Sequence, residues 1–413
     1  MSLCKRGNFL PCLALWAFAL PVCAQLPTSL PGVGSPVGLG DVNGDGHQDF
    51  AVTGSQILVY FGPLTAAATP ALMLDALGPG RVSPIGDVNR DGYADLAVGF
   101  PLSPTGGEVR IYWGSAAGLS AVTHTRLPAP ELYSGFGLAM TACNLAGDQA
   151  LEIVVGAPEA DVGQGEIWTY QISENGTPAN NPGRIVIAAS SAEFGTAVSC
   201  GDINGDGYGD LAVSAPLYNS APNFGGAVFV YRGSDAGVLA PEILTTAGAA
   251  GGAAFGKMLS LAGDINGDGR RDLVVLAQRQ VRAFSQREGT SSLSQFHSYE
   301  VAASEVLLEL TSAGDSNGDR YADLVFSVAG QAGRQRHVRL HGQALGVATR
   351  ASEEQAALGA RGCALVGDIT GDGIGDLLLS DEASGQLVTR VVAGPASYVF
   401  AGGFESGEAG QLP

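Results

Sequence analysis

One short segment, residues 41–49, carries the side chains best suited to chemistry. Its pattern is Asp-x-Asn-x-Asp-Gly-x-x-Asp. Three carboxylates and one amide oxygen held this close together repel one another and lose solvation unless a cation is present. Calcium is a hard cation that takes about six to eight oxygen ligands, so it suits this set best. The segment therefore predicts a calcium-binding loop.

The same pattern recurs along the chain. The intact copies occupy residues 41–49, 87–95, 202–210, 264–272, 315–323 and 368–376. A single copy could be an ordinary Asx turn, but six copies in one register favour a shared ligand. A seventh, degraded copy occupies residues 144–152 and has Ala146 at its third position. We expect this copy to bind calcium weakly or not at all.

The elements around the loops indicate how they are positioned. The copies recur about every 54 residues, a period typical of solenoids, propellers and arrays. A short aliphatic run follows most copies, as at 96–98 and 211–213, and predicts a strand buried on both faces. A second, more alternating strand comes next, as at 108–112. Four short strands in each of seven repeats predict an all-β fold, a seven-bladed β-propeller with calcium-binding β-hairpin loops.

The EF-hand is the obvious alternative calcium loop. It requires a bidentate Glu at position twelve and a helix on each side. Position twelve is apolar in all six intact copies, and a predicted strand follows directly. The sequence therefore excludes EF-hands.

Composition narrows the function. The 413 residues are 46% hydrophobic and 15% charged, and they include 61 Gly and 21 Pro, which indicates a large core and many turns. The net charge is −19, and no basic stripe exists to neutralise phosphates, so we expect no nucleic-acid partner. Half of the 40 acidic residues lie in the seven loop copies. The acidity is thus explained by metal sites.

The N-terminus predicts export. Lys5 and Arg6 precede an apolar run at 9–20, and Val22-Cys23-Ala24 offers a cleavage site, so residues 1–24 are interpreted as a signal peptide. Lipoprotein processing at Cys23, or a buried strand or anchor, are the alternatives. Residues 25–396 then form the seven-repeat propeller, and residues 397–413 form a strand end and a tail. We predict a protein that is secreted, at the cell surface or periplasmic, with no transmembrane helix.

Three cysteines lie outside the predicted signal: Cys143, Cys200 and Cys363. One disulfide with one free thiol is possible, but the spacing does not choose a pair. His337 and His341 lie four residues apart without the Glu of a zinc protease motif. We expect both histidines to be solvent-facing strand residues.

Two Phe-Gly dipeptides are each followed by a tripeptide that ends in Ala-Pro, and this combination resembles a known repeat. Phe136-Gly137 precedes Gly156-Ala157-Pro158, and Phe194-Gly195 precedes Ser214-Ala215-Pro216. With the acidic loops, these resemble the FG-GAP repeat proteins, whose best-known members form the N-terminal propeller of integrin α subunits. The resemblance covers roughly residues 30 to 395.

Lys5 and Lys257 are the only lysines among 21 basic residues, which is typical of GC-rich bacterial genomes.

The resemblance implies a ligand set for each intact loop. Calcium would take side chains at positions one, three, five and nine, and the backbone carbonyl at position seven. The implied ligands, about six sites in all, are Asp41, Asn43, Asp45, His47 and Asp49; Asp87, Asn89, Asp91, Tyr93 and Asp95; Asp202, Asn204, Asp206, Tyr208 and Asp210; Asp264, Asn266, Asp268, Arg270 and Asp272; Asp315, Asn317, Asp319, Tyr321 and Asp323; and Asp368, Thr370, Asp372, Ile374 and Asp376. Two residues depart from the pattern: Arg320 replaces the loop glycine, and Thr370 replaces Asn.

The functional prediction is a binding module. No acid–base constellation points to catalysis, so we expect a monomeric, non-enzymatic adhesion or ligand-binding module for an extracellular protein or glycan. A calcium-stabilised propeller enzyme acting on a polysaccharide or another extracellular substrate, and a structural cell-surface component, remain alternatives. Longer predicted loops at 101–107, 158–165 and 216–226 lie opposite the acidic loops, and binding tends to reside on such loops. Tyr218 and Phe224 are the predicted aromatic anchors.

Overall fold

In the residues that it describes, the structure, a computed structural model, is all-β apart from one short helical turn. It describes residues 34–392 except for 65–67, 76–80, 104–106, 133, 149, 219–224, 239, 246–253, 288, 291, 312–313, 331–334, 345, 348–351, 356–361, 372 and 384–385. The predicted signal peptide, the tail at 397–413, Asp372 and Phe224 lie outside the described residues. In the described part, no helix is long and apolar enough to cross a membrane.

The strands form consecutive antiparallel sheets, six of four strands and one of three. The first strands of the seven sheets are β1 (Ser35–Gly40), β5 (Arg81–Gly86), β9 (Ala139–Cys143), β13 (Val198–Gly201), β17 (Met258–Leu261), β21 (Val306–Thr311) and β27 (Gly362–Leu365). The second strands are β2 (Asp49–Thr53), β6 (Asp95–Gly99), β10 (Glu152–Ala157), β14 (Asp210–Ala215), β18 (Leu273–Ala277), β22 (Leu324–Ala329) and β28 (Leu377–Ala383).

The outer strands complete each sheet. The third strands are β3 (Gln56–Tyr60), β7 (Glu108–Tyr112), β11 (Glu166–Gln171), β15 (Ala227–Tyr231), β19 (Gln280–Gln286), β23 (Gln335–Leu340) and β29 (Gln386–Val392). The fourth strands are β4 (Leu72–Asp75), β8 (Thr125–Pro128), β12 (Gly183–Val186), β16 (Glu242–Thr245), β20 (Leu293–Glu300) and β26 (Ser352–Gln355). A separate ribbon, β24 (Gly342–Gln343) with β25 (Gly346–Val347), connects β23 to β26.

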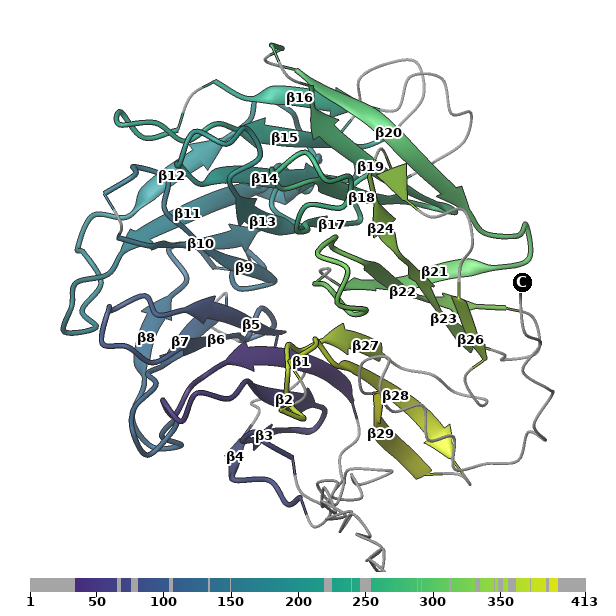
Figure 1. Cartoon of the computed structure of the whole chain (residues 1–413). Coiled ribbons are helices and arrows are strands. Elements are labelled where there is room, and N and C mark those ends of the chain that lie inside the picture. The colour runs from purple at the N-terminus through teal and green to yellow at the C-terminus, as the bar shows by residue number, and fades with distance from the viewer. Residues whose placement is uncertain are drawn as a thin grey trace, which may run out of the picture.

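The sheets are arranged as a propeller (Figure 1). The first strand of each sheet contacts the first strand of the next, from β1 through β5, β9, β13, β17 and β21 to β27. The ring closes where β27 contacts β1. The first strands therefore surround the centre, and the chain of each sheet moves outward from it.

The second strands are buried on both faces, as predicted. Every residue of β6, β10, β14 and β18 is buried. Each second strand is flanked by strands one and three of its own sheet and packed between two neighbouring sheets, so aliphatic runs without alternation suit it. These strands supply most of the core on which the loops are mounted.

The Phe-Gly dipeptides lock neighbouring sheets together. Phe136 and Phe194 are fully buried. Gly137 has φ +90°, and its backbone comes so close to Gly99 that a side chain at Gly99 would lie 2.0 Å from the Gly137 carbonyl oxygen. Only glycine permits this approach. The dipeptide is thus a packing device between β6 and the sheet that follows.

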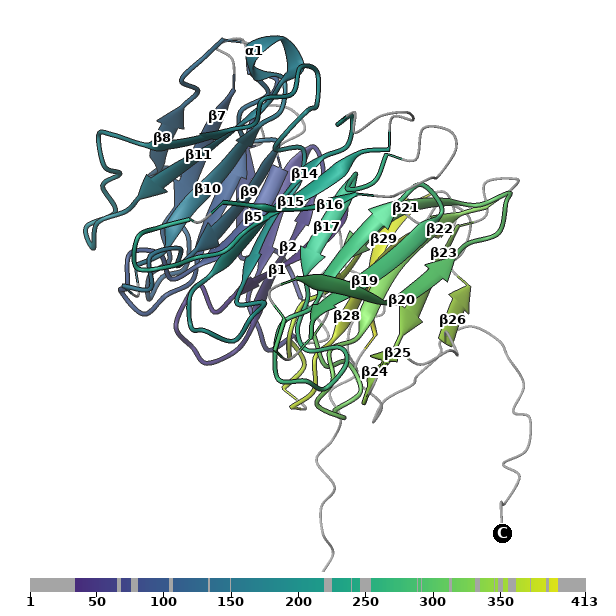
Figure 2. The same cartoon turned by 90° about the horizontal axis from the view of Figure 1, so that it is seen from above.

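Each antiparallel meander sends its connections to two opposite faces. Connections from strand one to two and from three to four emerge on one face, which we name the loop face. Connections from strand two to three, and from one sheet to the next, emerge on the opposite face. Figure 2 shows α1 (Ala160–Gly163), in the β10–β11 connection, at the opposite face, and β24 and β25 at the loop face.

Candidate metal centres

The acidic segments occupy equivalent places in the propeller. Each joins the first strand of a sheet to the second, and position nine is the first residue of the second strand or lies directly before it. They therefore share the loop face. The expectation of acidic loops within β-hairpins, rather than between helices, is confirmed.

Residues 41–49 show the common geometry. The Asp45 backbone N–H donates to both Asp41 Oδ1 (3.2 Å) and Asn43 Oδ1 (2.9 Å). Gly46 N donates to Asp41 Oδ2 (2.8 Å), and His47 N donates to Asp45 Oδ1 (2.9 Å). The side-chain oxygens of positions one, three and five therefore converge inside one turn of backbone.

The other intact loops repeat this convergence. The amide of position five donates to positions one and three in the second to fifth intact segments, at Asp91, Asp206, Asp268 and Asp319. In the last loop, Gly371 and Gly373 donate to Asp368, while Asp372 lies outside the described residues. Asn266 and Thr370 differ, because their side chains also turn toward Asp272 and Asp376 at position nine.

Position nine has a different environment. Its aspartate is fully buried in all six intact loops. In the first loop, Asp49 accepts from Val42 N (2.9 Å) and from Gly62 N (2.9 Å), which follows β3. The position-two amide donates to position nine in the other five loops also, at Asp95, Asp210, Asp272, Asp323 and Asp376. Position nine thus tethers the loop to its sheet.

Burial raises the pKa of several position-nine aspartates. The pKa of Asp49 rises to about 6 and that of Asp95 to about 7, chiefly by loss of solvent, with the nearby loop carboxylates adding to the effect. The pKa of Asp272 also rises to about 7. A nearby cation would favour the ionised form of each tether and oppose this rise.

The position-seven side chains reach the neighbouring loop. A methyl group built on Gly44 would lie 2.6 Å from the Tyr93 ring, and one built on Gly147 would lie 2.3 Å from the Tyr208 ring. Gly267 is covered in the same way by Tyr321. Each covered glycine is position four of the preceding loop. Sequence reasoning assigned position seven only a carbonyl and missed this contact.

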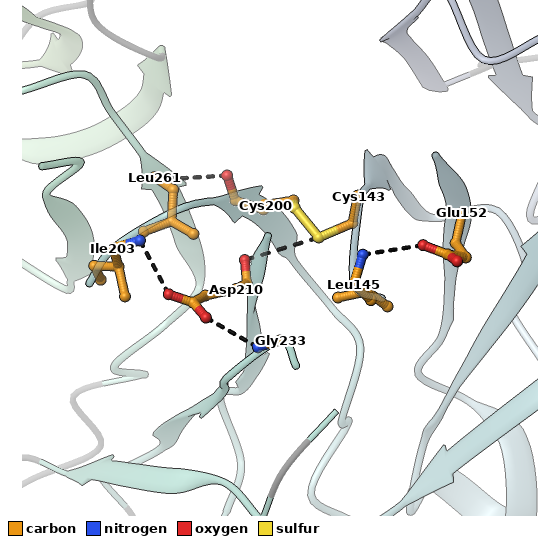
Figure 3. Close-up of a disulfide and its surroundings, with 9 residues drawn as sticks. Cys143, Leu145, Glu152, Cys200, Ile203, Asp210, Gly233 and Leu261 are labelled. Carbon is orange, nitrogen blue, oxygen red and sulfur yellow. Dashed lines mark hydrogen bonds between the residues drawn. A yellow bond between two sulfur atoms is a disulfide. The ribbon is translucent and has the colours of Figure 1, made fainter. Parts of the chain in front are cut away.

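The degraded loop keeps the buried carboxylate at position nine but lacks the full set of loop oxygens. Glu152 Oε2 accepts from Leu145 N (3.0 Å), as Asp210 accepts from Ile203 N (3.0 Å) in the next loop (Figure 3). Ala146 supplies no side-chain oxygen at position three. Asp148 accepts only the local Ala150 amide among the hydrogen bonds of the described residues. The chain therefore retains the architecture of the loop here without its oxygen cluster.

A disulfide joins this degraded loop to the intact loop beside it. Cys143, the last residue of β9, is bonded to Cys200 of β13, with 5.5 Å between the Cα atoms. Each cysteine lies within two residues of its acidic segment (Figure 3). Cys363 is free and buried. The sequence left this pairing open, because the proximity of β9 and β13 appears only when the sheets are side by side.

The expectation for His337 is wrong. Its side chain is buried, and its Nδ1 lies 3.0 Å from Ser327 Oγ, because β23 turns this residue inward against β22. His341 lies partly exposed beside the loop at 315–323, and its Nδ1 is 3.2 Å from Asp323 Oδ1. Burial acts to raise the pKa of Asp323, but hydrogen bonds from His341 and Ser316 outweigh it and lower that pKa.

The donor chemistry of the loops fits calcium. Positions one, three and five offer convergent oxygens, and His47 is the one side chain in these segments with a typical nitrogen ligand, which suits a hard cation. Within the described residues, no group of three or more His, Cys, Asp or Glu side chains is arranged to hold a metal ion. In the intact loops the position-nine carboxylate is turned onto backbone amides. Its role as a ligand stays a prediction.

Comparisons with known proteins identify a known repeat in this chain. The FG-GAP repeat family matches residues 80–112 and 194–231. Human integrin alpha-7 is 32% identical over 161 residues, which are 37% of this chain and 13% of that protein. Integrin alpha-PS5 of Drosophila melanogaster is 34% identical over 157 residues, 35% of this chain and 15% of that protein.

Two further matches broaden the picture. Bovine phosphatidylinositol-glycan-specific phospholipase D is 33% identical over 171 residues, 37% of this chain and 20% of that protein. The matches thus span at most a fifth of these relatives. A chain in the crystal structure of BBS1N in complex with ARL6DN, soaked with lead, superposes with a TM-score of 0.51 at 13% identity, over 90% of this chain and 95% of that one, which concerns the fold alone. The chain is thus a β-propeller that contains FG-GAP repeats and is related in sequence to integrin α subunits.

Proposed function

We propose that this protein is an extracellular, calcium-stabilised, seven-bladed propeller that binds a protein or glycan ligand and catalyses no reaction. The observation that carries the calcium part is the set of convergent oxygens repeated at one face of the propeller. The three-stranded sheet β27–β28–β29 is the seventh blade, because it completes the ring between β21 and β1.

Calcium would be held by positions one, three and five of each intact loop, with the position-seven carbonyl and, after reorientation, position nine. When bound, it compensates the charge of the loop carboxylates. The protein's part is to hold those carboxylates on short hairpins whose ends are fixed by strands and by the buried tether. Counting bound ions by mass spectrometry under native conditions tests this, with six expected and none to two contradicting it.

The proposed ligand surface lies on the face opposite the acidic loops. Four apolar side chains are exposed there, in the connections of the second, third and fourth blades: Leu102 (74%), Leu132 (68%), Val162 (92%) and Leu217 (45%). The connections support one another, because Glu159 N donates to Ser134 O (2.9 Å) and Leu217 N donates to Ala192 O (3.2 Å). Clustered exposed apolar groups on linked loops are typical of interaction surfaces.

The predicted aromatic anchors need revision. Tyr218 is only partly exposed, and its ring lies edge-on against Phe229, with 5.4 Å between ring centroids. It therefore stabilises the fourth blade. Phe224 lies outside the described residues. Leu217, directly before Tyr218, takes over as the exposed anchor of this connection.

A binding screen tests the ligand surface. We would screen the protein in calcium against a glycan array and a panel of extracellular proteins, and then compare the hits with the triple variant Leu132→Ser, Val162→Ser, Leu217→Ser. We expect binding to fall at least tenfold. Met73→Ser is the matched control, because Met73 is 56% exposed but lies on the outer strand β4. Full binding by the triple variant would place the interface elsewhere.

The enzyme alternative has weaker support. One relative is named a phospholipase, but the match covers a fifth of it. The cysteine, histidine and serine that approach one another here, Cys363, His337 and Ser327, are buried. Turnover in a broad hydrolase screen, retained after purification to homogeneity, would favour the alternative.

An oxidising compartment suits the disulfide. Disulfides persist mainly in secreted, surface and periplasmic proteins. We therefore propose export through the predicted signal at residues 1–24. Fractionation of a host expressing the full chain should place the protein outside the cytoplasm with a mature N-terminus near Gln25, whereas a cytoplasmic protein starting at Met1 would refute export.

A further inference from the structure

The third sheet contains a cavity of about 410 Å³ at the loop face. It opens between the degraded loop, strands β11 and β12, and the β15–β16 hairpin of the next sheet. Its lining includes Leu145, Glu152, Gln171, Ile185, Gly237 and Val238. A volume in the range of ~300–1,000 Å³ is typical of small-molecule sites.

The neighbouring sheets show what normally fills this space. In the first three sheets, a tyrosine of the third strand pairs with the residue after loop position nine: Tyr60 with Phe50, Tyr112 with Leu96, and Tyr170 with Ile153. The residue after each tyrosine is therefore equivalent in the three sheets. These residues are Phe61, Trp113 and Gln171.

The two aromatic rings pack against a hairpin glycine of the following sheet. A methyl group built on Gly118 would lie 2.3 Å from the Phe61 ring, and one built on Gly176 would lie 2.9 Å from the Trp113 ring. The corresponding glycine facing the third sheet is Gly237, and no atom lies within 4 Å of a methyl group built there. The cavity is the space of an aromatic ring that Gln171 leaves open.

The hairpins themselves are alike. Gly118 N donates to Ser115 O (2.6 Å), and Gly237 N donates to Ser234 O (2.9 Å). The hydroxyl of each serine donates back to the glycine carbonyl, at 2.7 and 2.6 Å. The cavity therefore results from the replaced side chain and not from a displaced hairpin.

The walls combine polar and apolar groups. Glu152 is 6% exposed, and its side chain hydrogen-bonds with the Leu145 amide and with Gln171. Thr169 and Asn181 add a hydroxyl and an amide to the lining. Leu145, Ile185 and Val238 supply the apolar part. The rim guanidinium of Arg184 is bonded to Glu166 and contributes no free charge.

We propose that this cavity binds one pyranose ring, a hexose or N-acetylhexosamine unit of a glycan. The equivalent spaces hold six-membered rings, so the dimensions suit one. A carboxylate, two amides and a hydroxyl match ring hydroxyls, which both donate and accept. The apolar wall matches the C–H face of the sugar. The proposal depends neither on calcium nor on the opposite face.

The test uses free sugars and a filled cavity. Saturation-transfer NMR on the full protein, with a panel of hexoses and N-acetylhexosamines each at millimolar concentration, should give a signal for at least one sugar. Gln171→Phe, which copies Phe61, should abolish it while leaving the melting temperature unchanged or raised. Trp113→Phe is the matched control and should keep the signal.

A second variant protects the test against misfolding. Glu152→Gln retains the shape and an acceptor for Leu145 N, and we expect it to weaken sugar binding about tenfold. Absence of a signal for every sugar with the wild type, or a signal that persists unchanged in Gln171→Phe, overturns the proposal. Binding of N-acetyl-tyrosinamide without any sugar also overturns it and assigns the cavity to an aromatic side chain of a protein partner.

Discussion

The degraded loop at 144–152 and the intact loop at 202–210 lie side by side, and they share a buried carboxylate but not a full set of loop oxygens. Both keep the buried carboxylate that accepts the position-two amide, Glu152 in one and Asp210 in the other. Hydrogen bonds link the degraded loop to the next sheet. Gly209 N, in the intact loop, donates to Asn144 O, and Ser234 N, after β15, donates to Leu145 O. Among positions one, three and five, Asn144 and Ala146 replace the Asp and Asn of the intact loop, and only Asp148 keeps its carboxylate.

This difference separates two functions within one pattern. Position nine is architectural, because it persists where the oxygen cluster is lost. Positions one, three and five carry the oxygens that we propose as the main calcium ligands. The degraded loop also has the disulfide at its base, so a covalent bond lies where neighbouring loops would rely on a cation. Five experiments test whether the two loops differ in this way.

Removal of calcium should have the largest effect. With a Kd of about 1 mM, 10 mM calcium stabilises the fold by about 1.4 kcal/mol per site, and six sites together by roughly 8 kcal/mol. We expect excess EGTA to lower the melting temperature by about 10 °C or more. Superimposable melting curves in calcium and EGTA would refute calcium stabilisation.

Loss of the disulfide should come next. The cysteines are 57 residues apart in sequence, and closing a loop of that length stabilises by up to about 4 kcal/mol. Cys143→Ala with Cys200→Ala should therefore lower the free energy of unfolding by a similar amount in calcium and in EGTA. Reduction of the wild type should reproduce the loss and leave the double variant unaffected. If the free energy of unfolding falls only in calcium, the disulfide does not stabilise the fold independently of the metal.

Removal of an intact tether should destabilise without calcium. Asp210→Ala leaves the buried amides of Ile203 and Gly233 without their acceptor, at a cost of about 3 kcal/mol. Urea unfolding in EGTA measures it, and Asp210→Asn should recover part of the loss. If the cost vanishes in EGTA, position nine acts only through the metal.

Removal of a ligand position should show the opposite dependence. Asp206→Ala should reduce the calcium count by one and cost about 1.4 kcal/mol in 10 mM calcium, with little effect in EGTA. Asp148→Ala in the degraded loop should leave the count unchanged. A wild type that binds seven ions would show that the degraded loop is still a site.

The smallest effect should come from backbone strain. Arg320 has φ +75°, whereas the equivalent Gly46 and Gly207 have φ +87° and +88°. Left-handed backbone disfavours side chains other than glycine, so Arg320→Gly should stabilise by about 0.5–1 kcal/mol with an unchanged calcium count. Destabilisation in thermal melts would show that the Arg320 side chain contributes contacts that outweigh the strain.

The features that repeat along the chain were predictable from the sequence alone. The spacing of the acidic segments predicted the propeller, and the aliphatic runs after them predicted buried second strands. The residues of each loop are local, so their convergence at positions one, three and five follows from turn geometry within nine residues. The solvent-facing placement of His337 failed because a single strand pattern does not reveal which face meets a neighbouring sheet.

The contacts between one sheet and the next could be seen only in the tertiary structure. The Cys143–Cys200 bond, the cover of Gly147 by Tyr208, and the cavity under Gly237 each join residues at least 57 positions apart. Such contacts depend on the packing of adjacent blades, which side-chain spacing along the chain does not encode. Position nine shows the same limit, since its burial and its hydrogen bonds to backbone amides appear only when the loop is packed on its own sheet.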